Sequence, residues 1–219
     1  MSETIHVMTQ HTSPSLLVLN FSPRGGRSGS RKLAEEYLTS WRAAHPDGRT
    51  IVREIGLNPP PAVSEAWIAG AFTPREQHTP EMREAIGVSD AFLDEFFGAT
   101  EIVIATPIYN LNIPAALKLW IDQIVRIGRT FVVDASGYKG LAGGRTVKVL
   151  VSSGGDLRPG QPAGALNYAE PYLRGVFGFI GVDRVEFVYA PNQSASDDQR
   201  AAALAEAIEA ARGLAAAAA

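Results

Sequence analysis

Apolar residues are concentrated in five short runs that are separated by longer amphipathic segments. The runs lie at Ser15–Phe21, Arg49–Ile55, Glu101–Thr106, Thr146–Val151 and Arg184–Tyr189. Short, nearly continuous apolar runs are typical of parallel strands that are covered on both faces. Because helical segments come between the runs, the pattern predicts an α/β fold, a doubly wound five-stranded parallel sheet with helices on both faces.

The segments between the runs carry apolar side chains at helical spacing. Leu33 and Trp41 fall on one face of a helix that we expect over residues 31–44, with Ser28 or Ser30 as its cap. Residues 130–144 predict a short strand followed by a glycine-rich excursion. The other expected helices are a short one near residues 65–70, one that Thr79-Pro80 opens, one from Ile113 that ends before Gly128, one near Pro171–Ile180 and one at Asp197–Leu214.

Length and composition indicate one globular domain. The chain has 219 residues, which is enough for a substantial core, and 46% hydrophobic with 20% charged residues is an ordinary globular balance. The first 14 residues are polar and lack the apolar core of a signal peptide or a membrane span. We therefore expect a disordered extension over residues 1–14, a single domain over residues 15–214, and a cytoplasmic protein that does not contact membranes.

Charge and cysteine usage exclude several classes of function. The net charge of −3 gives no basic field for a nucleic-acid backbone. The chain has no cysteine, which excludes disulfides, iron–sulfur clusters, thiolate metal sites and cysteine nucleophiles. The four histidines show no metal-ligand spacing. The sequence therefore predicts no nucleic-acid partner, no metal and no acyl-transfer triad.

Three loops rich in glycine, serine or proline follow the first, third and fourth strands, so they are expected at the same edge of the sheet. The first loop has the composition of an anion cradle, because glycines let backbone N–H groups approach an oxyanion and serines add hydroxyl donors. The N-terminus of the next helix adds a partial positive charge. The alternative is a mobile turn without a ligand. The loop's glycines and serines are Ser22, Gly25, Gly26, Ser28, Gly29 and Ser30.

Known phosphate motifs narrow the choice of ligand for this loop. A nucleoside-triphosphate loop needs Gly-Lys-Ser/Thr, whereas this chain has Gly29-Ser30-Arg31. Arg24 stands where the dinucleotide fingerprint has its first glycine, so Glu54 is set aside as a ribose ligand. A phosphatase on this topology would need a cysteine. Flavin mononucleotide (FMN) remains as the best candidate.

The other two loops have groups that suit an isoalloxazine ring. Pro107–Asn112 can present backbone amides to the polar edge of the ring, and Asn110 can both donate and accept hydrogen bonds. Tyr109 can flank the ring, although for these two residues taken alone an Asx turn at Asn110 and core packing of Tyr109 are the preferred explanation. Ser152–Gly155 can bring N–H groups against the pyrimidine side, where donors stabilise the charge of the reduced ring.

Together the three loops resemble those of the FMN-dependent NADH azoreductases, a family that also reduces quinones. The resemblance extends from Leu16 to about Ala210 and implies a flavodoxin-like fold with the strand order 2-1-3-4-5. It assigns the FMN phosphate to Ser22 and to Ser28-Gly29-Ser30. The remaining cofactor-binding residues that it implies are Ile108, Tyr109, Asn110, Leu111, Ser152, Ser153, Gly154 and Gly155.

The resemblance also implies a reaction and an assembly. In that family two electrons pass by a ping-pong mechanism from NADH or NADPH to a small aromatic acceptor such as a quinone or azo compound, and the flavin carries the chemistry. The absence of a basic cluster for a 2′-phosphate favours NADH. The family is homodimeric with the pocket at the interface, which places Phe131 and Phe179 in the substrate pocket, with Phe179 contributed by the partner subunit.

The chain departs from the family pattern at three positions. Leu111 replaces a usual aromatic residue, Ser153 a usual arginine, and Val133 a tyrosine found in some members. These changes open or depolarise the pocket, so they bear on the choice of acceptor more than on the cofactor. Arg24 and Arg27 can either pair with the phosphate or face water, and we expect them to face water.

Two rival functions use the same fold. A flavodoxin-type electron carrier is usually shorter and strongly acidic, whereas this chain is near neutral and has an insertion at Ser136–Gly144. The opening Ser-Pro-Arg-Gly-Gly-Arg-Ser is also similar to that of NAD(P)H-dependent FMN reductases. A protein that reuses the fold without a cofactor would be colourless, and the fold alone does not decide among these functions.

Overall fold

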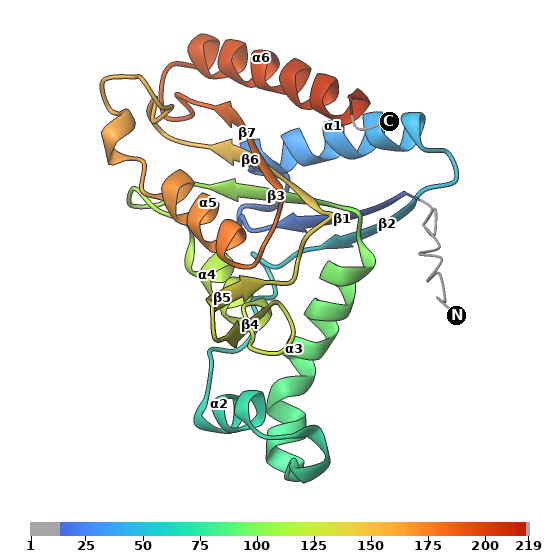
Figure 1. Cartoon of the computed structure of the whole chain (residues 1–219). Coiled ribbons are helices and arrows are strands. Elements are labelled where there is room, and N and C mark those ends of the chain that lie inside the picture. The colour runs from blue at the N-terminus through green and yellow to red at the C-terminus, as the bar shows by residue number, and fades with distance from the viewer. Residues whose placement is uncertain (1–13, 218–219) are drawn as a thin grey trace.

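The computed structural model describes residues 14–217 and is built around a five-stranded parallel sheet (Figure 1). Every neighbouring pair of strands in this sheet is parallel. Apart from Pro14, the extension expected at residues 1–14 lies outside the described residues. Across the sheet the strands are β2 (Arg49–Arg53), β1 (Ser15–Asn20), β3 (Glu101–Pro107), β6 (Thr146–Ser152) and β7 (Arg184–Ala190).

The predicted apolar runs form the interior of this sheet. Every residue of β1 and β3 is buried, because helices cover both faces at these central positions. Strand β2 is at the edge, and its Ile51 and Val52 side chains are 42% and 43% exposed. The least apolar of the five predicted runs is thus an edge strand, where one face needs no cover.

Helices cover both faces of the sheet (Figure 1). Because side chains alternate along a strand, Leu16 and Val18 pack on one face while Leu17 and Leu19 pack on the other. Within residues 14–217, no helix combines the length and the apolar character that crossing a bilayer requires. The helices are α1 (Gly29–Ala44) and α6 (Asp197–Ala216) on the first face, and α3 (Pro80–Gly98), α4 (Ala115–Ile124) and α5 (Ala169–Phe179) on the second.

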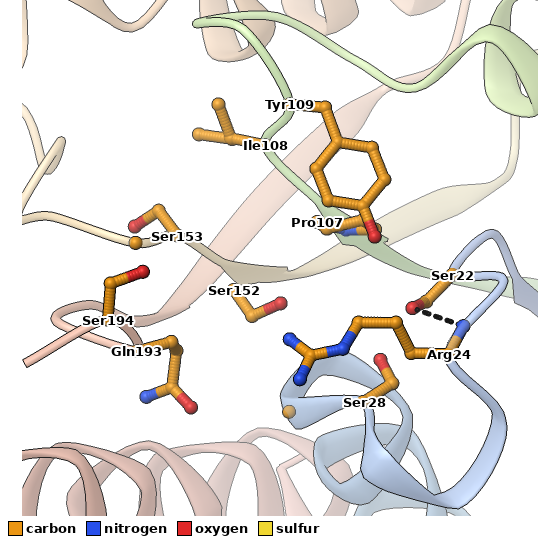
Figure 2. Close-up of a pocket in the computed structure, with 12 residues that line it drawn as sticks. Ser22, Arg24, Ser28, Pro107, Ile108, Tyr109, Ser152, Ser153, Gln193 and Ser194 are labelled. Atoms are coloured by element: carbon orange, nitrogen blue, oxygen red, sulfur yellow. Dashed lines mark hydrogen bonds between the residues drawn. The ribbon is translucent and has the colours of Figure 1, made fainter.

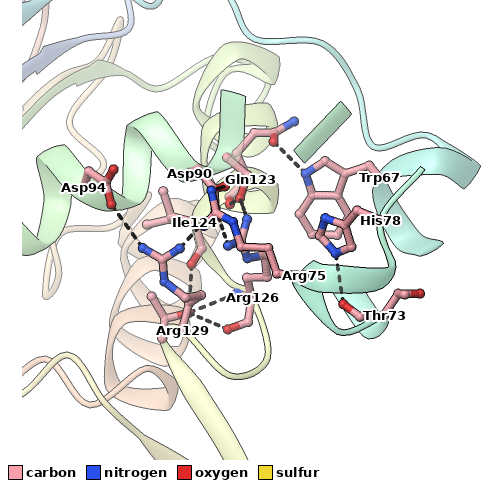
Figure 3. A network of polar contacts seen from close by, with 12 residues as sticks. Trp67, Thr73, Arg75, His78, Asp90, Asp94, Gln123, Ile124, Arg126 and Arg129 are labelled. Carbon is pink, nitrogen blue, oxygen red and sulfur yellow. Dashed lines mark hydrogen bonds and ion pairs between the residues drawn. The ribbon is translucent and has the colours of Figure 1, made fainter. Parts of the chain in front are cut away.

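The short helix α2 (Glu65–Phe72) packs against α3, well away from the sheet, and polar contacts link α2 to α4 and the segment after α4 to α3 (Figures 1 and 3). The indole Nε1 of Trp67 donates to Gln123 Oε1 at 2.8 Å. Arg126 and Arg129 both donate to the Asp90 carboxylate. Since the Arg126 side chain is only 8% exposed, this ion pair fixes the chain just after α4.

The region expected to hold a short strand and a glycine-rich excursion is a separate antiparallel hairpin, β4 (Phe131–Asp134) and β5 (Gly137–Gly140). The sequence did not predict β5, because a four-residue strand with glycine at both ends lacks an apolar pattern. A Cβ on Gly140 would lie 2.3 Å from the backbone nitrogen of Gly181. Glycine at this position therefore lets the hairpin sit directly against the end of α5.

Candidate cofactor site

One cavity of about 200 Å³ at the carboxyl ends of the strands collects residues from four loops (Figure 2). The three loops predicted from the sequence, after β1, β3 and β6, all contribute. A fourth loop, after β7, contributes two residues that the sequence analysis did not identify. The lining residues are Ser22, Arg24, Ser28, Gly29, Pro107, Ile108, Tyr109, Ser152, Ser153, Gly154, Gln193 and Ser194.

Hydroxyl and N–H groups meet at the N-terminus of α1. Ser28 is buried, and its Oγ accepts a hydrogen bond from the N–H of Arg31 at 3.3 Å, so it caps the helix. Ser30 lies behind it, with the two hydroxyl oxygens 3.1 Å apart. The N–H groups of Gly29 and Ser30 have no acceptor within residues 14–217, as expected in a first helical turn. This arrangement attracts an anion.

A charged network under the first loop holds it in place. Arg31 Nε donates to the carbonyl oxygen of Gly25 at 3.0 Å, and both terminal nitrogens of Arg31 donate to the Glu54 carboxylate. Asn20 Nδ2 also donates to Glu54, at 2.9 Å. Glu54, which the sequence analysis set aside as a ribose ligand, is thus occupied in bracing the loop. Burial acts to raise the pKa of Glu54, but hydrogen bonds from Arg31 and Asn20 outweigh it and hold the pKa below its usual value.

Replacing Glu54 with glutamine should lower the free energy of unfolding at neutral pH by about 1 to 2 kcal/mol. The folded protein lowers the pKa of this carboxyl, so its contribution is present above the ordinary carboxyl pKa and is lost as the pH falls through the folded value. The free energies of unfolding of wild type and E54Q, measured with denaturant, should therefore differ at pH 7 and become equal in acid. A difference that stays constant down to pH 3 would contradict this account. The double variant R31Q/E54Q should lose less unfolding free energy than the sum of the losses in R31Q and E54Q.

The second loop contains a strained turn that exposes backbone donors. Tyr109 and Asn112 exchange two backbone hydrogen bonds of 3.0 Å, and the residues between them, Asn110 and Leu111, have φ angles of 48° and 71°. Left-handed backbone in residues other than glycine costs about 1 to 2 kcal/mol each, and such strain is found mainly at functional sites. Within the described chain the N–H groups of Asn110 and Leu111 donate to no acceptor, so they are available to a ligand.

The third and fourth loops brace each other at the end of β6 and β7. The N–H groups of Gln193 and Ser194 donate to the carbonyl oxygens of Ser153 and Gly154 at 2.9 and 3.1 Å. A Cβ on Gly154 would lie 2.9 Å from Ser194 Oγ, so a larger residue there would displace the Ser194 hydroxyl. The Ser153 hydroxyl donates back to the carbonyl oxygen of Gly155 at 2.8 Å. The N–H groups of Gly154 and Gly155 have no acceptor within residues 14–217 and remain available.

The structure separates the predicted site residues into two groups. Those that line the cavity are Ser22, Ser28, Gly29, Ile108, Tyr109, Ser152, Ser153 and Gly154. Those that lie beside it on the same loops are Ser30, Asn110, Leu111 and Gly155. Arg24 and Arg27 are both exposed, as the sequence analysis expected, but Arg24 also lines the cavity, which that analysis did not predict.

The predicted substrate-pocket residues form an aromatic cluster outside the cavity. The ring centroids of Phe131 and Phe179 are 4.8 Å apart, and Tyr138 lies 5.4 Å from Phe179. This cluster joins the β4–β5 hairpin to the end of α5. Phe179 and Tyr138 are 37% and 71% exposed, and Val133 on the same hairpin is 54% exposed. An exposed apolar surface of this kind is typical of a contact with another molecule.

The donor set of the cavity fits a phosphate monoester joined to an acceptor-rich ring. Buried hydroxyls, free N–H groups and one guanidinium lie around the α1 N-terminus, and none of the twelve lining residues carries a carboxylate. Free N–H groups from the second and third loops lie beside the cavity, where ring carbonyl and nitrogen acceptors can pair with them. These are the complementary groups that FMN requires.

Comparison with known proteins identifies the family. A profile of the flavodoxin-like fold matches residues 14–214. The FMN-dependent NADH:quinone oxidoreductase 2 of Trichormus variabilis is 48% identical over 197 residues, which covers 90% of this chain and 95% of that protein.

Solved structures agree with this assignment. An azoreductase from Bacillus anthracis str. Sterne superposes with a TM-score of 0.85 at 29% identity and covers 93% of this chain and 99% of its own. An FMN-dependent NADH-azoreductase from Bacillus anthracis str. Ames Ancestor, solved in complex with FMN, superposes with a TM-score of 0.80 at 25% identity. The match covers 92% of this chain and 99% of that chain. The chain therefore belongs to the flavodoxin-like fold family that includes the FMN-dependent NADH:quinone oxidoreductases.

Proposed function

We propose that the protein is an FMN-dependent oxidoreductase that moves two electrons from NADH, or NADPH, to quinones or aromatic azo compounds. The observation that carries this proposal is the cavity at the carboxyl ends of the strands. It combines an anion cradle at the start of α1 with unpaired N–H donors on two neighbouring loops. The names of the 48%-identical relative and of the 29%-identical solved structure support the same reaction class.

Each loop has a distinct role in this proposal. Ser22 and the Ser28–Ser30 segment bind the FMN phosphate with hydroxyl and N–H donors. In the segment 108–111 the N–H groups of Asn110 and Leu111 donate to the edge of the ring, and in the segment 152–155 those of Gly154 and Gly155 donate to its pyrimidine side. When bound, FMN supplies the two-electron chemistry, with the nicotinamide and the acceptor reacting in turn in a ping-pong cycle. The protein binds, orients and excludes water, and no side chain is assigned as an acid or base.

A homodimer completes the pocket in this proposal. Phe179 is exposed at the end of α5 and packs against the half-buried Phe131 of the hairpin, and neither residue lines the cavity of its own chain. A second copy would place this aromatic cluster against the open side of the cavity, where flat aromatic acceptors bind. The cofactor-binding domain spans residues 15–214, close to the match of the flavodoxin-like profile.

Steady-state kinetics tests the proposed reaction. With NADH and a water-soluble quinone as the two varied substrates, double-reciprocal plots should be parallel, as a ping-pong cycle requires. An aromatic azo compound should replace the quinone as acceptor, and NADPH should be the poorer donor because no basic cluster awaits its 2′-phosphate. Lines that intersect would contradict the ping-pong order, and absence of turnover with every acceptor would contradict the proposed function.

A further inference from the structure

The cavity contains one charged side chain, that of Arg24. The other eleven lining residues are uncharged. Figure 2 shows the guanidinium directed into the space between Ser28, Ser152 and Gln193. An arginine carries its positive charge at all physiological pH values. The cavity therefore presents a full positive charge to whatever enters it.

No carboxylate of the described residues neutralises Arg24. Within residues 14–217, no carboxylate forms an ion pair with it at 4.0 Å or less, although fourteen such pairs link other residues. Most arginines of this chain, including Arg31 and Arg126, are paired in this way. A guanidinium that points into a cavity and lacks a counter-charge has its best partner in an anionic ligand.

The backbone beneath Arg24 is fixed, so its side chain starts from a defined position. The N–H of Arg24 donates to Ser22 Oγ at 3.3 Å. The next residue, Gly25, has a φ of +55°, which reverses the chain, and its carbonyl accepts from Arg31 Nε. These contacts place the base of Arg24 directly beside the buried hydroxyl of Ser22. The charge thus adds to the hydroxyls and to the positive end of α1 on the same side of the cavity.

Arg27 provides an internal comparison. It lies three residues further along the same turn and is exposed, as Arg24 is, but it does not line the cavity. The two arginines therefore carry the same charge on the same loop, but only Arg24 reaches the ligand position. Any effect that is specific to Arg24 must come from its contact with the ligand, because both residues contribute similarly to the long-range field.

We infer that Arg24 is the residue that makes this site select a phosphorylated flavin over the unphosphorylated one, by forming a charge-assisted contact with the phosphate dianion. This inference rests on the proposed function, since it assumes that a flavin occupies the cavity. The serines and the helix N-terminus provide geometry and partial charge, whereas Arg24 provides the only full charge among the twelve described lining residues. Removing the Arg24 side chain should therefore weaken the binding of FMN and leave the binding of riboflavin unchanged.

Flavin titrations of the full-length, flavin-stripped protein test the inference, with flavin fluorescence as the readout. R24Q should weaken FMN binding by about 10- to 100-fold, the usual range for a lost hydrogen bond to a charged group. Riboflavin affinity should change by less than about 2-fold, because riboflavin has no phosphate. R24K should lie between wild type and R24Q, since lysine keeps the charge without the planar fork.

R27Q is the matched control and should bind FMN like wild type. Raising the salt concentration should weaken FMN binding to wild type and R27Q more than to R24Q. Equal losses for FMN and riboflavin in R24Q, or equal effects of R24Q and R27Q, would overturn the inference. Wild type that takes up neither flavin would overturn the proposed function and this inference together, whereas FMN uptake unchanged by R24Q overturns the inference alone. Circular dichroism confirms that each variant is folded.

Discussion

Replacing Ser28 with alanine is expected to weaken FMN binding by about 10- to 100-fold and to lower the free energy of unfolding by about 1 kcal/mol. Ser28 has two roles in the structure. Its Oγ caps α1 by accepting the N–H of Arg31, and the same hydroxyl lines the cavity next to Ser30 Oγ. Alanine removes the cap and a phosphate donor at once. Flavin titration and denaturant unfolding measure the two losses separately.

Ser196 offers a matched control for the capping role. Its Oγ caps α6 by accepting the N–H of Gln199 at 3.4 Å, and it does not line the cavity. S196A should lose a similar amount of stability and keep its affinity for FMN. If S28A and S196A retained FMN equally well, Ser28 would be a helix cap and nothing more, and the anion cradle would have to be placed elsewhere.

Replacing Phe179 with arginine is expected to convert the proposed dimer to a monomer and to reduce turnover by at least about 30-fold, while FMN stays bound. The Phe131–Phe179 cluster is an exposed apolar surface, and a charge in its centre would be buried without a partner at an interface. The residues that line the cavity lie on the loops after β1, β3, β6 and β7 and do not include this cluster, so flavin affinity should change little. Size-exclusion chromatography with light scattering, flavin titration and steady-state kinetics give the three readouts.

Ile51→Arg is the control for this variant. Ile51 is 42% exposed, like Phe179, but it lies on the edge strand β2 rather than on the hairpin or α5. The Ile51→Arg protein should remain dimeric and active. A Phe179→Arg protein that is monomeric yet fully active would contradict a pocket shared between subunits, and one that remains dimeric would contradict this cluster as the interface.

The parts of the fold that the sequence predicted are those with the strongest local pattern. The interior strands could be located because layers on both faces make them continuously apolar, as at Leu16–Leu19. The start of α3 was predicted from Thr79-Pro80, and the Thr79 hydroxyl does accept the N–H of Met82. Strand β5 was not predicted, because its position depends on the close approach of Gly140 to Gly181, which involves residues distant in sequence.

The candidate site shows the same division. The three loops could be predicted because parallel strands bring their carboxyl ends to one edge of the sheet. The same rule applied to β7 would have found Gln193 and Ser194, but that loop lacks a glycine-rich signal. The place of Arg24 at the cavity could not be predicted, because the cavity is formed with residues of three other loops that are distant in sequence. The roles of Phe131 and Phe179 stay predictions.

The measurement that tests the central claim most directly is the visible spectrum of the purified protein before and after NADH is added without oxygen. The account predicts a yellow protein whose flavin absorption bleaches rapidly with NADH and returns when a quinone is added. A yellow protein that neither NADH nor NADPH can bleach would identify an electron carrier and contradict the proposed reaction. A colourless protein that takes up no added FMN would contradict the cofactor assignment itself.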